Sequence, residues 1–262
     1  MRMDIPESIL RKIAGKEYVC DDIGRSGSSV LMFEDMVLKI ETESEEARRA
    51  AAMMQWLEGR IPAPELLEWT TCGGMSYTLM TRVRGEMACV PRYMERPKKL
   101  AKLLAHGLRM LWETEASECP VKNGLNEKLA LARMRVEQGL VDVEDAEPGT
   151  FSPGGFASPR ELLIWLEENR PEEEMVLSHG DFCLPNIYLK DGCVSGFVDL
   201  GRSGAADKWQ DIALCWRSLM ANADGTYGCR YGGYDRSLLF DELGIEPDWE
   251  KVRYFILLDE LF

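Results

Sequence analysis

The sequence predicts an α+β fold with two lobes: a small β-rich N-terminal lobe, residues 1–85, and a larger, mainly helical C-terminal lobe, residues 86–262. Two observations lead to this prediction. Short strand-like runs separated by turn residues recur through the first 85 positions, whereas helical periodicity dominates after Gly85. A chain of 262 residues is also long enough to bury a large core.

The N-terminal lobe shows five strand-like segments and one helical segment. Residues 43–56 carry alanine and methionine at the spacing of one helix face, and Gly59 with the following IPAP sequence ends this helix. Glu34-Asp35 is expected to form the tight turn of a hairpin. The expected strands are 19–23, 29–33, 36–40, 66–70 and 75–81.

The C-terminal lobe is expected to hold several helices and one hairpin. Ser158 followed by Pro159 is a typical helix start, because serine caps the first turn and proline fits its first position. The sequence Lys190-Asp191-Gly192 is a turn signal between two strands. The expected helices are 98–115, 127–138, 159–169, 208–221 and 248–262, and the expected strands are 187–189 and 194–198.

Composition limits the class of function. Hydrophobic residues make up 45% and charged residues 29%, which is ordinary for a globular protein. A net charge of −14 disfavours binding to nucleic acid or anionic membranes and attracts cations. There is no apolar run long enough for a membrane span and no apolar leader, so we expect a cytoplasmic protein. Eight scattered cysteines without a CxxC pair, and only two histidines, disfavour a zinc site.

The strongest motif begins at His179 and reads HGDFCLPN, followed after a hairpin by DLG. Moving a γ-phosphoryl group requires a residue that orients the attacking hydroxyl and accepts its proton, and oxygen ligands for magnesium. Asp181 fits the first role, while Asn186 and Asp199 fit the second. The hairpin brings the chain back so that Asn186 and Asp199 can share an ion. His179 is expected to brace the loop rather than to act as a base.

Lys39 lies on the strand-like segment 36–40, from which a lysine could reach the phosphates of ATP. Upstream, residues 24–29 read GRSGSS, and glycines there allow backbone N–H groups to approach phosphates. This loop lacks the GK[ST] ending of a Walker sequence, which disfavours a P-loop NTPase.

Over nearly its whole length the chain resembles the aminoglycoside 3'-phosphotransferases. The resemblance implies a bilobal protein-kinase-like fold and transfer of phosphate from ATP to the 3'-hydroxyl of kanamycin-type antibiotics. The two longest matching segments are the most specific. The segments that carry the resemblance are WLEGRIPAPELL, PRELL, PEEEMVLSHGD, NIYLKDGCVSGFVDLGRSGAADKWQDIALCWRS and PDWEKVRYFILLDELF.

The resemblance also implies roles for individual residues. It makes Asp181 the catalytic and substrate-binding acceptor, Asn186 and Asp199 the Mg²⁺ ligands, and Lys39 a ligand of the nucleotide phosphates. The other implied nucleotide-binding residues are Ser26, Met80, Thr81 and Val83, the last three forming a hinge beside the adenine. The implied residues for the cationic aminoglycoside are Arg202, Arg217, Asp259, Glu260 and Phe262.

Charge supports the implied substrate, because carboxylates offer charge-assisted hydrogen bonds to the ammonium groups of an aminoglycoside. The acidic start of the loop 142–159 corresponds to the drug-covering loop of the family, although its length differs here. Arg202 and Arg217 could contact the drug directly or could organise carboxylates. We expect a monomer or a weak dimer.

Two positions depart from the family pattern. The helix glutamate that pairs with the strand lysine is replaced by Ala50, and an aromatic residue that stacks on adenine is replaced by Val37. Glu46, one helical turn before Ala50, is expected to take over in part; otherwise Lys39 is held by the nucleotide and Asp199 alone.

Two other functions stay open at this point. One is a kinase of another metabolite, such as choline, on the same fold. The other is a degenerate, non-catalytic protein that holds nucleotide or drug, and Ala50 is the residue that keeps this alternative open. The sequence does not distinguish ATP from GTP or one aminoglycoside from another.

Overall fold

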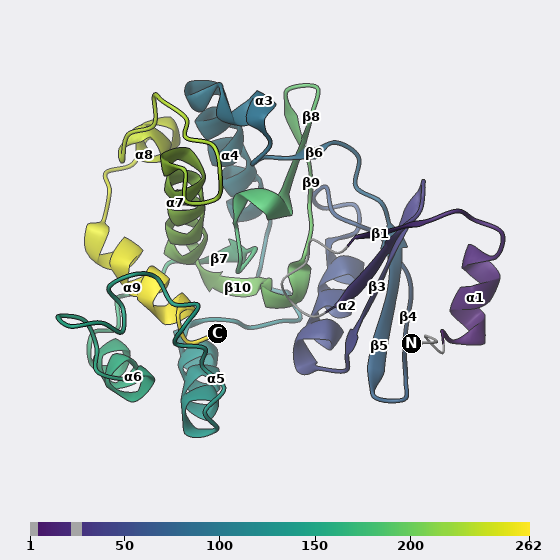
Figure 1. The fold of residues 1–262 in the computed structure, drawn as a ribbon, viewed down its shortest axis with the longest axis horizontal. Helices are drawn as coiled ribbons and strands as arrows, with labels where there is room; N and C mark the ends of the chain where they lie inside the picture. Colours follow the sequence, from purple (N-terminus) through teal and green to yellow (C-terminus); the bar gives the residue numbers. More distant parts are fainter. Residues whose placement is uncertain (1–4, 22–27) are drawn as a thin grey trace.

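A five-stranded antiparallel sheet forms the N-terminal part of the protein (Figure 1). The computed structural model describes residues 5–21 and 28–262. In the sheet the strands are ordered β1-β2-β3-β5-β4, and α1 (Glu7–Ile13) lies at the outer edge of the molecule (Figure 1). The strands are β1 (Val19–Asp21), β2 (Ser29–Met32), β3 (Met36–Thr42), β4 (Leu66–Cys72) and β5 (Met75–Thr81).

The two faces of β3 have different surroundings. Met36, Leu38 and Ile40 are buried in a small apolar core formed by the sheet and α1, while the residues between them face the opposite side. This alternation is the period of two expected of a strand with one covered face. Lys39 is therefore placed on the side of the sheet that faces the rest of the protein.

Helix α2 (Glu45–Leu57) lies between the sheet and the helical part of the molecule (Figure 1). The Ser44 hydroxyl caps its first turn by accepting a hydrogen bond from the N–H of Ala47. Its buried residues Met53, Met54 and Leu57 pack in the large core together with the C-terminal helices. Helix α2 precedes the lobe boundary predicted at residue 85, but its packing ties it to the larger core. The boundary itself stays a prediction.

The C-terminal part is mainly helical. Ser158 accepts a hydrogen bond from the N–H of Glu161 and begins α6, so the predicted cap is confirmed. Helices α7 and α9 pack against each other, and the chain ends in the middle of the molecule beside α5 rather than at its edge (Figure 1). The helices are α3 (Pro91–Met94), α4 (Pro97–Trp112), α5 (Leu125–Glu137), α6 (Pro159–Glu168), α7 (Lys208–Asp224), α8 (Leu238–Leu243) and α9 (Trp249–Asp259).

Two small antiparallel sheets frame the motif loops. Strands β6, β8 and β9 form one sheet, and β7 pairs with β10 in the other. The predicted hairpin turn is present: Asp191 and Gly192 both have positive φ, 52° and 80°, as a two-residue type I′ turn requires. The elements are β6 (Glu86–Met87), β7 (Met175–Ser178), β8 (Ile187–Lys190), β9 (Cys193–Phe197), β10 (Gly204–Asp207) and the 3₁₀ turns η1 (Leu184–Asn186) and η2 (Leu200–Arg202).

Within the described parts of the chain, no helix combines the length and the apolar character that crossing a membrane requires. The elements that the sequence did not predict are all short: α1, α3, α8, β6, β7, β10 and the two 3₁₀ turns.

Candidate active site

The loop that carries Asp181 follows β7 and is held by buried polar groups. The carboxylate of Asp211, which is fully buried on α7, accepts the backbone N–H groups of His179 at 2.7 Å and Gly180 at 2.9 Å. Gly180 has a φ of 82°, and a Cβ atom there would lie only 1.8 Å from the carbonyl oxygen of Arg202. Only glycine fits this close approach, which brings the Asp181 loop against the Asp199 turn.

Asp181 and Asn186 are in direct contact. The side-chain amide of Asn186 donates to Oδ2 of Asp181 at 2.9 Å and to its carbonyl oxygen at 3.0 Å. The backbone carbonyl of Asn186 accepts the N–H of Val198, which precedes Asp199. The ring of His179 contacts the Val198 carbonyl through Nε2 and the N–H of Asp181 through Nδ1, which is the bracing role expected of it.

Asp199 has a left-handed backbone conformation, with φ 60° and ψ 66°. This conformation is uncommon for a residue other than glycine and persists where the surrounding structure fixes it. It turns the chain from β9 into η2. The carboxylate of Asp199 then lies 3.3 Å from Nζ of Lys39 on β3.

Lys39 is shared by two carboxylates, because Oε2 of Glu41 lies 3.2 Å from the same Nζ. Burial lowers the pKa of Lys39, but Asp199 and Glu41 outweigh burial and raise it above its ordinary value. The structure corrects both sequence expectations for this lysine. Glu46 pairs with Arg202 at 3.9 Å instead of with Lys39, and Asp199 is not the sole protein partner.

The expected adenine hinge begins in the last two residues of β5 and continues to Val83. Met80 packs against the large core, and the hydroxyl of Thr81 accepts the N–H of Glu65 just before β4. Val83 lies against Gly196 of β9, where an added Cβ would be 2.5 Å from its Cγ1. The hinge residues are thus fixed between the two parts of the fold. Ser26 lies outside the described residues.

At the C-terminus, one carboxylate holds two guanidinium groups. Arg202 donates to Oδ1 of Asp259 at 3.0 Å and Arg217 donates to Oδ2 at 2.5 Å. Burial by itself would raise the pKa of Asp259, but Arg217 and Arg202 hold it below the ordinary value. Of the two roles left open for the arginines, the structure displays the one in which they organise a carboxylate.

Glu260 connects the tail to the acidic loop. Its Oε2 accepts the N–H of Glu147 at 3.0 Å, and Oε1 of Glu147 lies 3.5 Å from Nε of Arg217. Burial raises the pKa of Glu260 to about 7. Glu147, at the end of the acidic stretch, therefore lies against the tail, as a loop that covers an acceptor site would require.

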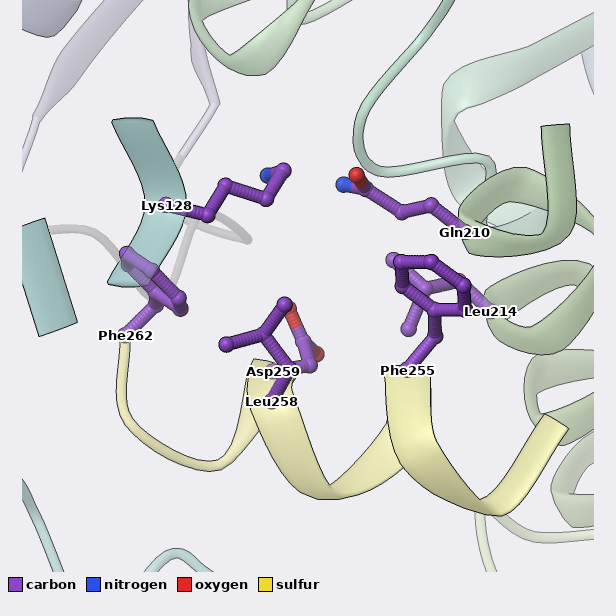
Figure 2. A pocket seen from close by; sticks show the side chains of 7 residues that line it. All are labelled: Lys128, Gln210, Leu214, Phe255, Leu258, Asp259 and Phe262. Atoms are coloured by element: carbon purple, nitrogen blue, oxygen red, sulfur yellow. The ribbon is translucent and has the colours of Figure 1, made fainter. Parts of the chain in front are cut away.

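Behind the tail, Lys128 and Gln210 extend toward each other over a small hollow bounded by Phe255 and Phe262 (Figure 2). Lys128 is 7% exposed, and burial, followed by the charge of Arg202, lowers its pKa to about 8. Its ammonium lies 5.5 Å from the centre of the Phe262 ring, and the Arg202 guanidinium lies 5.6 Å from that centre. The last aromatic ring is thus held by two cations.

The donor set next to Asp181 consists of hard oxygen atoms. Among the described residues, no group of three or more histidine, cysteine, aspartate or glutamate side chains could hold a metal. A magnesium ion bound with substrate phosphates uses only one or two carboxylates. Asp199 supplies one, and the described hydrogen bonds leave the side-chain oxygen of Asn186 unused. These residues fit Mg²⁺ bound together with a nucleotide.

The sequence interpretation missed three residues of this site. Glu41 could have been found from its spacing, because residues two apart on a strand share a face. Asp211 stands among apolar positions of a helix, a pattern that indicates a buried carboxylate. Lys128 had no comparable signal, since its burial depends on the distant tail.

Comparison with known proteins gives a consistent assignment. A family model described as "Phosphotransferase enzyme family" matches residues 24–255. The chain is 38% identical to an aminoglycoside 3'-phosphotransferase of Enterococcus faecalis, over 100% of this chain and 99% of that protein. It is 36% identical to a protein of the same name from Niallia circulans, over 98% and 97% of the two chains.

Solved structures agree with the sequence relatives. The fold is similar to an aminoglycoside 3'-phosphotransferase of type VIII, with a TM-score of 0.80, 27% identity and 97% of both chains covered. It is also similar to an aminoglycoside phosphotransferase from Streptomyces rimosus in complex with ADP and streptomycin. That match has a TM-score of 0.73 and 27% identity, with 92% of this chain and 94% of the other covered.

Proposed function

The chain belongs to the phosphotransferase enzyme family, and we propose that it is an aminoglycoside 3'-phosphotransferase that confers resistance to kanamycin-type antibiotics. The observation that carries this function is the full-length similarity to proteins of that name, at 36–38% identity. The geometry agrees with it, since an aspartate, an asparagine and a second aspartate of the phosphoryl-transfer motif lie together beside a strand lysine. The fold is the bilobal α+β fold expected from the resemblance.

On the nucleotide side, Lys39 and Ser26 bind the phosphates of ATP. Met80, Thr81 and Val83 line the adenine. Asn186 and Asp199 would hold Mg²⁺, which would neutralise charge that develops on the phosphoryl oxygens. A relative bound to ADP supports a nucleotide substrate. Val37 stands at the expected adenine-stacking position and supplies an apolar wall there.

The chemistry on the acceptor side centres on Asp181. Its carboxylate orients the drug hydroxyl and accepts the proton as the hydroxyl oxygen attacks the γ-phosphorus. The bond to the oxygen between the β and γ phosphates breaks, and ADP leaves with the electron pair. Asn186 fixes the Asp181 carboxylate through its amide, so the base is held in place before the substrate binds.

The tail binds the polycationic drug. Glu260 and the terminal carboxylate of Phe262 offer negative charge to ammonium groups, while Arg202 and Arg217 hold Asp259 in its ionised form next to them. The acidic loop that contacts Glu260 covers the bound drug. We further propose that the enzyme acts in the cytoplasm as a monomer or weak dimer.

The proposed function is tested with purified protein, ATP and Mg²⁺ by following ADP release with different acceptors. We expect turnover of kanamycin, which has a 3'-hydroxyl, and none of tobramycin, which lacks it. Choline, used as a third acceptor, tests the alternative that the protein is a kinase of another metabolite. Equal turnover of kanamycin and tobramycin, or turnover of choline alone, would contradict the assignment, and ADP binding without turnover of any acceptor would indicate a degenerate protein.

A further inference from the structure

Helix α2 offers Lys39 no carboxylate. Ala50, at the position where the related enzymes are expected to carry glutamate, packs against the large core. The side chain of Glu46 lies instead on the turn after Asp199: its Cγ is 2.6 Å from the position of a Cβ on Gly201, and its Oε1 is 3.9 Å from Arg202. The lysine is therefore not tied to this helix.

Strand β3 supplies the missing carboxylate. Lys39 and Glu41 are two residues apart and so point to the same face of the sheet. Their side chains are 21% and 20% exposed, and their charged atoms are 3.2 Å apart. On the neighbouring strand β5 the paired residues are Thr78 and Ser76, whose small side chains leave room for the ion pair.

Asp199 and Glu41 are not equivalent partners of the lysine. The proposed function assigns Asp199 to the metal, whose charge then competes with Lys39 for that carboxylate. Glu41 has no other cation within ion-pair distance among the described residues, apart from Lys39. Burial, which is the largest influence on Glu41, raises its pKa, and Lys39 opposes this. The Glu41 carboxylate thus depends on the lysine for its charge partner.

From these contacts we propose that Glu41 is the positioning residue of Lys39 and replaces the helix carboxylate lost at position 50. Glu41 fixes the lysine rotamer from within one rigid strand and directs the ammonium toward the nucleotide phosphates. This inference rests on the proposed function for the role of Lys39. Glu41 itself acts through the lysine and does not contact the reacting atoms.

The test compares Glu41→Gln with Glu43→Gln, a matched change nearby, since Glu43 pairs with Arg48 and not with Lys39. We expect Glu41→Gln to lower kcat/KM for ATP about tenfold, the size of one lost charge-assisted contact. The KM for kanamycin should stay within about twofold, and Glu43→Gln should leave all constants unchanged. An ATP KM that is unchanged or lower in Glu41→Gln overturns the proposal.

Restoring the helix carboxylate provides a second test. In the Glu41→Gln background, Ala50→Glu should recover most of the lost kcat/KM for ATP, whereas in the wild-type background it should change it less than about twofold. Groups that share one partner couple in this way. Equal effects of Ala50→Glu in both backgrounds would show that Glu41 and position 50 do not serve the same lysine, and would overturn the proposal.

A binding experiment separates this inference from the proposed function. Calorimetry with ADP and no acceptor should show about tenfold weaker binding for Glu41→Gln and unchanged binding for Glu43→Gln, whichever acceptor the enzyme uses. Glu41→Asp, which keeps the charge, should fall between wild type and Glu41→Gln, and thermal unfolding confirms that each variant is folded. If kanamycin is not turned over but Glu41→Gln still weakens ADP binding, only the drug assignment is refuted. If all variants bind ADP with equal affinity, the role of Glu41 is refuted.

Discussion

Two ion clusters lie near the Asp181 loop and are centred on opposite charges. In the lysine cluster, one cation, Lys39, is shared by Glu41 and Asp199. In the arginine cluster, two cations, Arg202 and Arg217, both donate to the carboxylate of Asp259, and other carboxylates lie farther from them. An excess of carboxylate leaves the lysine cluster ready to accept Mg²⁺ and phosphates. Two guanidinium groups on one carboxylate instead fix Asp259 in place and keep it ionised. In the lysine cluster, Mg²⁺ and phosphates can replace the present ion pairs. In the arginine cluster, the ion pairs with Asp259 are retained.

The largest effect is expected at Asp181, which belongs to neither cluster. Asp181→Asn should lower kcat by about 10²–10⁴-fold, because it removes the proton acceptor, while both clusters remain intact. Drug and nucleotide affinities, measured by calorimetry, should change only a few fold. Asp191→Asn, the same change on the exposed β8–β9 turn, is the control. Substantial turnover by Asp181→Asn would mean that another residue prepares the hydroxyl.

The arginine cluster should be broken by Asp259→Asn, which removes the charge of the carboxylate that both half-buried guanidinium groups share. We expect a loss of about 2–3 kcal/mol in the free energy of unfolding at pH 7. Because the pKa of Asp259 is depressed in the folded protein, its contribution is present above the unfolded value, 3.8, and is lost as the pH falls further. Denaturant unfolding should show the difference between wild type and variant shrinking at low pH. A difference independent of pH would argue against the ion pairs as its source.

The edge of the arginine cluster is probed by Glu260→Gln. The folded pKa of Glu260, about 7, lies above its unfolded value of 4.5, so its stabilising contribution is present below pH 4.5 and is lost as the pH rises through 7. Wild type should thus lose about 1 kcal/mol relative to the variant between pH 5 and pH 8, allowing for partial solvation. Saturating kanamycin, which favours the ionised carboxylate, should reduce this loss. Parallel stability curves for the two proteins would contradict the raised pKa.

The smallest effect is expected at Glu46, whose exposed carboxylate lies at the edge of the arginine cluster, 3.9 Å from Arg202. A pair of this kind contributes about 0–1 kcal/mol, so Glu46→Gln should change the KM for ATP by less than about twofold. The comparison with Glu41→Gln makes the result informative, since the same chemical change is made on the helix and on the strand. If Glu46→Gln were the more harmful of the two, the lysine would depend on α2 after all.

Local features of this protein could be predicted from the sequence. The bounds predicted for β5, 75–81, are those observed, and Ser158 caps α6, because both depend on short-range patterns. The roles proposed for Asp181, Asn186 and Asp199 follow from one motif whose members are separated only by a loop and a hairpin. For the same reason, the turn at Asp191-Gly192 was predictable from two residues.

Contacts between distant segments could not be predicted in this way. The pairing of β7 with β10 joins two four-residue strands that have no turn between them. The partner of Lys39 was misassigned because helix spacing places Glu46 near Ala50, while tertiary packing directs that side chain to Arg202. The resemblance named Asp259, but that it holds two arginines depends on how α9 packs against α7, which no local pattern encodes.

The position of Glu41 has a consequence for regulation. In protein kinases, moving the helix that carries the lysine's partner switches the enzyme on or off. Here the partner is on the same strand as the lysine, and displacement of α2 would not separate the two. A ligand that pushes this helix outward should therefore leave the contact between Lys39 and Glu41 intact.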